Sequence, residues 1–218
     1  MEVFFGVFFI VVVAFLLYRR NQRKLVARRE VLIDAYPFPQ KIGAMVQEKY
    51  PHLSDNEVEL VLAGLREYFH LCNIAGRRLV SMPSQVVDVA WHEFILFTRK
   101  YEFFCSKALG RFLHHTPAEA MSSPTEAQKG IQRAWKISCH REEIAPRAPN
   151  RLPVLFSIDA DLNISDGFHY ARNCQAGKQE PYCAGHIGCS SGCGGGCAGE
   201  SLGESSGGDG CGGGCGGD

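Results

Sequence analysis

The stretch DVAWHEFILFTRKYEFFC, residues 88–105, carries an aspartate and a histidine whose spacing could support chemistry. In a helix, residues i and i+4 lie on the same face, so the Asp88 carboxylate can reach the His92 imidazole. Such a carboxylate can fix the tautomer of the imidazole. Cys105 falls on another face of the same predicted helix, beside Tyr101, and we do not expect it to join the pair.

The sequence leaves three interpretations of Asp88 and His92 open. The pair can be a solvated ion pair on a polar stripe, or a partly buried contact that locks two helices together. It can also belong to a metal or acid/base site. That third interpretation requires His114 or His115, which follow a predicted helix stop at Gly110, to fold back. Two imidazoles and a carboxylate are a suitable ligand set for zinc or non-haem iron.

Further residues around this pair form a longer pattern, D-x-x-W-H, then Y-x-x-F-C, then G-x-F-L-H-H-x-P. Over residues 40–145 the chain resembles the glycine-rich domain-containing protein-like family, and small bacterial members of it in particular. The residues that carry the resemblance are Asp88, Trp91, His92, Tyr101, Cys105, Gly110, Phe112, Leu113, His114, His115 and Pro117. The resemblance implies a candidate functional unit (Asp88, Trp91, His92, Tyr101, Cys105, His114 and His115). It implies no established reaction and no catalytic residue.

A second set of candidate ligands lies in the glycine-rich end of the chain, where cysteines recur as C-x3-C. These residues are Cys183, His186, Cys189, Cys193, Cys197, Cys211 and Cys215. Thiolates and imidazole suit zinc, Cu(I) or an iron–sulfur cluster. Because few apolar residues remain to build a core, we expect this segment to be disordered when free. A low-complexity tail without bound metal and a metal-binding tail both fit the pattern.

Helix signals dominate the middle of the chain. Ser54 and Glu57 form a capping box before an apolar run. His70 lies off the apolar face predicted for this helix, which carries Val58, Val61, Leu62, Leu65, Phe69 and Cys72. Ser84 is a predicted N-cap of the helix that carries Asp88. Pro124 marks the first turn of another helix. No run of alternating strands appears, so we expect an all-α domain, although the sequence does not assign residues 154–164. The predicted divisions are an anchor (1–35), a helical domain (36–175) and a Gly/Cys-rich tail (176–218).

The N-terminal segment is apolar from Val3 to Tyr18, and only basic charges follow from Arg19 to Arg29. This pattern predicts a short, uncleaved transmembrane helix with the N-terminus outside and the rest of the chain in the cytoplasm. A single-pass protein of a bacterial inner membrane is the expectation, with the lipid bilayer as a partner. In that reducing compartment the ten cysteines would be thiols or metal ligands.

The net charge and the absence of common enzyme motifs reduce the number of function classes to consider. The formal net charge is zero, so we expect no nucleic-acid partner. No glycine-rich phosphate loop, G-x-S-x-G or H-E-x-x-H motif is present. The sequence favours a membrane-anchored binding or scaffold module with a protein partner. The alternative is a metalloprotein, holding zinc or another transition metal through Asp88, His92 and a distal histidine or through the cysteine tail.

Overall fold

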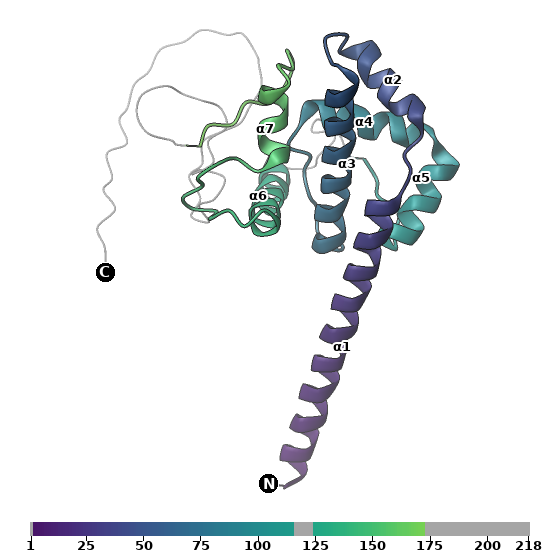
Figure 1. Cartoon of the computed structure of the whole chain (residues 1–218). Helices are drawn as coiled ribbons and strands as arrows, with labels where there is room; N and C mark the ends of the chain where they lie inside the picture. Colours follow the sequence, from purple (N-terminus) through teal and green to yellow (C-terminus); the bar gives the residue numbers. More distant parts are fainter. Residues whose placement is uncertain (1, 116–123, 173–218) are drawn as a thin grey trace, which may run out of the picture.

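The computed structural model describes residues 2–115 and 124–172, and all the regular secondary-structure elements in this part of the chain are helices. It contains seven α-helices and one π-helical turn, with no strand among the described residues (Figure 1). The elements are α1 (Glu2–Ala35), α2 (Gln40–Lys49), α3 (Asp55–Ala75), α4 (Gln85–Leu96), α5 (Thr98–Phe104), η1 (Cys105–Leu109), α6 (Pro124–Arg141) and α7 (Val154–Asp161). The expected all-α class is therefore confirmed for these residues. The predicted tail lies outside them.

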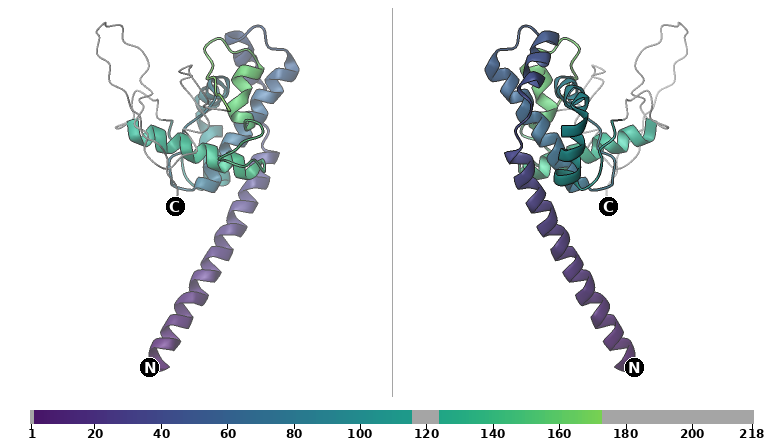
Figure 2. Two further views of the ribbon diagram at one scale, coloured as in Figure 1. Left: turned by 90° about the vertical axis from the view of Figure 1, so that its left-hand side faces the viewer. Right: turned by 90° about the vertical axis from the view of Figure 1, so that its right-hand side faces the viewer.

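Helix α1 corrects the prediction of a membrane anchor. Among the helices described here, none is both long enough and apolar enough to cross a bilayer. The apolar run ends at Tyr18, which leaves it shorter than the roughly 20 residues that a span needs, and the same helix then continues through the basic segment to Ala35. The transmembrane helix, the single-pass topology and the inner-membrane location are therefore wrong. Figure 2 shows the first turns of α1 extending away from the other helices.

The last turns of α1 pack against α3, and polar contacts fix them there. Ile33 is fully buried, and Asn73 on α3 donates a hydrogen bond to the Val26 carbonyl at 3.1 Å. The His70 imidazole of α3 lies 2.7 Å from the Asp34 carboxylate. These contacts reveal that His70, which lies off the apolar face predicted for this helix, is nevertheless buried.

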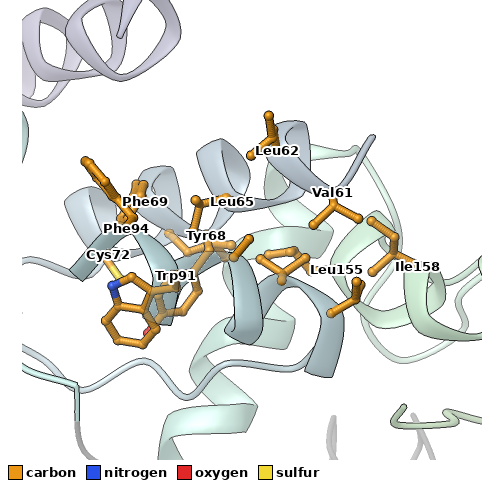
Figure 3. Packing of buried hydrophobic residues seen from close by; sticks show 14 of the residues in the cluster. Val61, Leu62, Leu65, Tyr68, Phe69, Cys72, Trp91, Phe94, Leu155 and Ile158 are labelled. Carbon is orange, nitrogen blue, oxygen red and sulfur yellow. The ribbon is translucent and has the colours of Figure 1, made fainter. Parts of the chain in front are cut away.

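Helix α3 lies at the centre of the bundle and contacts α1, α2, α4, α6, α7 and η1. It begins with the predicted capping box: Ser54 accepts from the Glu57 amide, and the Glu57 side chain accepts from the Ser54 amide at 2.8 Å. Its buried side chains meet those of α4 and α7 in one apolar cluster (Figure 3). The labelled members are Val61, Leu62, Leu65, Tyr68, Phe69, Cys72, Trp91, Phe94, Leu155 and Ile158.

The segment expected to form one helix from Ser84 to Gly110 is divided. Ser84 is the N-cap of α4 as predicted, but the helix ends at Leu96, because Phe97 leaves the helical region with φ −80° and ψ 55°. Helix α5 and the π-helical turn η1 follow, and Gly110 closes η1 in the left-handed conformation, with φ 68°. A side chain at this position would be strained and would overlap the Arg29 guanidinium of α1.

The two remaining helices cover the other side of α3. Helix α6 begins at Pro124, as the sequence predicts, and α7 occupies most of the segment that the sequence left unassigned. The buried rings of Trp135 on α6 and Phe156 on α7 meet edge to face, with centroids 5.1 Å apart. The sequence left the segment of α7 unassigned because short apolar helices are hard to distinguish from strands by periodicity alone.

Candidate metal centre

Two members of the site come from α4. Asp88 lies in the first turn of this helix, where the partial positive charge of the helix N-terminus favours a carboxylate. His92 lies one turn later, and its Nδ1 is 3.2 Å from a carboxylate oxygen of Asp88. The Asp88 side chain is 20% exposed and the His92 side chain 48% exposed. The pair therefore sits at the edge of the core, where a metal ion could reach it.

The third member, His115, comes from the segment that follows η1. Its Nε2 lies 3.3 Å from the other carboxylate oxygen of Asp88. Its ring centroid is 4.0 Å from that of His92 and 4.7 Å from that of Trp91. One carboxylate thus faces two imidazoles, one on each oxygen.

A left-handed turn and two hydrogen bonds bring this segment back over α4. The left-handed Gly110 turns the chain, and the Arg111 guanidinium donates to the carbonyl of Gly76 at 2.9 Å. The Tyr101 hydroxyl donates to the carbonyl of Leu113 at 2.5 Å. Leu113 is buried, so the chain is pinned two residues before His115.

The resulting geometry is that of a candidate metal-ligand group. Asp88, His92 and His115 each offer one ligand atom, and these atoms all lie within 4.8 Å of one another. Imidazole nitrogen and carboxylate oxygen bind zinc at about 2.0–2.2 Å. Ligand atoms this close together could bind a single ion.

The other residues of the predicted unit occupy different places. Trp91 and Tyr101 are buried behind His115, and the Trp91 indole donates to the Tyr101 hydroxyl at 3.1 Å. Burial raises the pKa of the Tyr101 phenol. Cys105 is buried beneath Tyr101, where burial raises the pKa of its thiol, and it is not part of the ligand group. His114 is exposed, with its ring against that of Phe112.

The predicted tail ligands lie outside the described residues. They are Cys183, His186, Cys189, Cys193, Cys197, Cys211 and Cys215. The cysteines that the structure does describe, Cys72, Cys105 and Cys139, are free thiols buried in the core. A structural role for Cys72 agrees with the apolar face predicted for its helix.

Sequence reasoning did not separate His115 from His114, although a signal was present. Residues of an extended segment alternate between two sides. Leu113 is buried, whereas Phe112 and His114 are exposed and His115 is half-buried, so the burial alternates along this short run. The hydrogen bonds of Tyr101 were not predictable in this way, since they depend on the break in the helix at Phe97.

The fold and the site define an all-helical protein with a candidate group of one carboxylate and two imidazoles as metal ligands. The chain belongs to the UCP032817-like family, an uncharacterised family whose model matches residues 28–189. This match corrects the resemblance to the glycine-rich domain-containing protein-like family, which rested on short motifs around one helix and the loop after it. Neither a curated protein nor a solved structure matches the chain.

Proposed function

We propose that this protein binds a divalent first-row transition-metal ion, zinc or iron(II), through Asp88, His92 and His115. The observation that carries the proposal is the convergence of these three side chains from α4 and the segment after Gly110. Of the three interpretations of Asp88 and His92, this convergence favours the metal site. A surface ion pair does not require a second imidazole from another part of the chain.

The number of ligands indicates what kind of site this would be. Structural zinc sites are usually closed by four protein ligands, whereas catalytic sites use three and leave a position for water or substrate. One carboxylate and two imidazoles with open positions also form the ligand set of many non-haem iron(II) oxygenases. With the three ligands that the described residues supply, the ion here would keep an open position. Such an ion can activate water or polarise a bound oxygen.

The chemistry of the ligands narrows the choice of metal. Imidazole suits zinc, copper, iron and nickel, and a carboxylate oxygen adds a harder ligand. Cys105 is buried beneath Tyr101, away from the ligand group, so the ligands found within residues 2–115 and 124–172 include no thiolate. A site built from these ligands alone disfavours Cu(I) and iron–sulfur clusters.

Metal content of the whole chain tests the proposal. We expect anaerobically purified protein to contain zinc or iron by mass spectrometry, and His115→Ala and Asp88→Asn to lose about one ion per chain. His114→Ala is the matched control, since it removes the neighbouring exposed imidazole and leaves the ligand group intact. Any metal held by the cysteine-rich tail would be equal in all four proteins. Equal content in the wild-type protein and the ligand variants would reject the proposal.

A further inference from the structure

The Tyr101 hydroxyl links the helix that carries two of the proposed ligands to the segment that carries the third. It accepts from the Trp91 indole at 3.1 Å and donates to the Leu113 carbonyl at 2.5 Å. The direction of both bonds is fixed, because an indole N–H can only donate and a carbonyl can only accept. All three residues are buried. In such surroundings an unpaired polar group is costly, so the hydroxyl stabilises this one arrangement.

Both hydrogen-bond partners of Tyr101 are next to the proposed ligands, in the sequence or in space. Trp91 lies on α4 between Asp88 and His92, and its ring meets the His115 ring edge to face at a centroid distance of 4.7 Å. Leu113 is separated from His115 by one residue. Fixing the Trp91 indole and the Leu113 carbonyl through one oxygen atom therefore restricts where the His115 imidazole can lie.

We infer that Tyr101 is a positioning residue, whose hydroxyl holds His115 against Asp88 and His92. The consequence for metal affinity rests on the proposed function. The positioning of the imidazole does not, because it concerns contacts that exist without an ion. Groups that orient metal ligands in this way commonly contribute about 10- to 100-fold to metal affinity.

Tyr68 offers a matched control within the same core. Its hydroxyl is also buried, donates to a backbone carbonyl (Val80, at 3.0 Å), and its ring packs against that of Trp91. Val80 lies before α4, however, and is not part of the segment that carries His115. Tyr68→Phe therefore removes a comparable hydrogen bond from the core without releasing the segment that carries the histidine.

Cobalt(II) titration of the whole protein provides the metal-dependent test. Cobalt(II) is a spectroscopic substitute for zinc, and its visible absorption reports the geometry of its ligands. We expect Tyr101→Phe to bind cobalt(II) about 10- to 100-fold more weakly than the wild-type protein, with an altered visible spectrum. Tyr68→Phe is expected to retain the wild-type affinity and spectrum, although urea unfolding should show that both variants lose stability.

A metal-free measurement separates the inference from the proposed function. In the apo protein, the Trp91 and His115 rings are close enough for a nuclear Overhauser effect between their protons. We expect Tyr101→Phe to lose this signal and Tyr68→Phe to keep it. If the wild-type protein bound no cobalt(II), the proposed function would fail and this signal alone would decide the positioning role. An unchanged signal in Tyr101→Phe, or unchanged cobalt(II) affinity and spectrum, would overturn the inference.

Discussion

At the scale of single residues, burial keeps the core thiols protonated and therefore unsuited to binding a metal ion. Cys72 is enclosed by the α3 core, and burial raises the pKa of its thiol to about 12, despite a hydrogen bond with Tyr68 that lowers it. Burial likewise raises the pKa of Cys139 to about 11. The thiolate is the form that binds metals and reacts as a nucleophile. These cysteines therefore serve as small core residues.

The raised pKa of Cys72 predicts loss of stability in alkaline solution. The unfolded thiol releases its proton near pH 9, whereas the folded one holds it to about pH 12. The stability that the folded state gains by keeping the Cys72 thiol protonated is thus fully present below pH 9. It is lost as the pH rises through about 12. For this group alone, the free energy of unfolding should fall by about 1 kcal/mol between pH 9 and 10.

Urea unfolding at both pH values checks this expectation. Cys72→Ala is the comparison, since the variant lacks the titrating group but keeps the rest of the core. Its free energy of unfolding should fall less over the same interval. Parallel pH dependence in the two proteins would show that the Cys72 thiol does not titrate as its burial requires.

At the scale of elements, the start of α4 determines where the two helical ligands lie. The buried Asp159 carboxylate on α7 accepts from the Ser84 hydroxyl and the Gln85 amide, both at 2.7 Å. It also accepts from the amides of Val86 and Phe168. A residue far along the chain thereby satisfies amides that the first turn of α4 leaves without helical partners.

We expect Asp159→Ala to lower the free energy of unfolding by about 3 kcal/mol, because it leaves several buried donors without an acceptor. Asp161→Ala is the matched control on the same helix, where the side chain is exposed, and should change stability by less than about 0.5 kcal/mol. Chemical denaturation of both variants measures the difference. Similar losses would mean that Asp159 acts through its charge on α7 and not through its cap of α4.

At the scale of the whole molecule, one guanidinium joins three helices. Arg141 on α6 forms a two-pronged contact with Glu67 of α3, with N–O distances of 2.6 and 3.0 Å, and reaches Glu30 of α1 at 3.4 Å. The Arg141 side chain is 25% exposed. Its planar fork matches a carboxylate in a way that a lysine could not. The last turns of α1, which pack against α3, are therefore also linked to α6 by this ion pair.

Replacing Arg141 by Met should lower the free energy of unfolding by about 2 kcal/mol, since it leaves two carboxylates without their cation. Amides near Glu30 should also exchange faster with deuterated water, because α1 would lose one of its attachments. Arg147→Met is the control, as Arg147 is exposed on the loop after α6. Hydrogen exchange at Glu30 that stayed at the wild-type rate would contradict this role.

Sequence reasoning succeeded where the determinants are local. The Ser54 cap, the Ser84 cap and the stop at Gly110 each depend on a few neighbouring residues. It failed where distant segments decide the outcome. The burial of His70 requires α1, and the choice of His115 requires the contact between Tyr101 and the segment after η1. The preference for a binding or scaffold module with a protein partner stays a prediction, without its membrane anchor.

The central place of α3 has a consequence for how the chain folds. A helix that contacts six other elements is the surface on which each of them must pack, so we expect its contacts to form early in folding. Its core substitutions should therefore slow folding more than they speed unfolding, as expected for a folding nucleus. Leu65, fully buried at the middle of α3, would then belong to the transition state. The early turns of α1, which extend beyond the bundle, would not affect the folding rate.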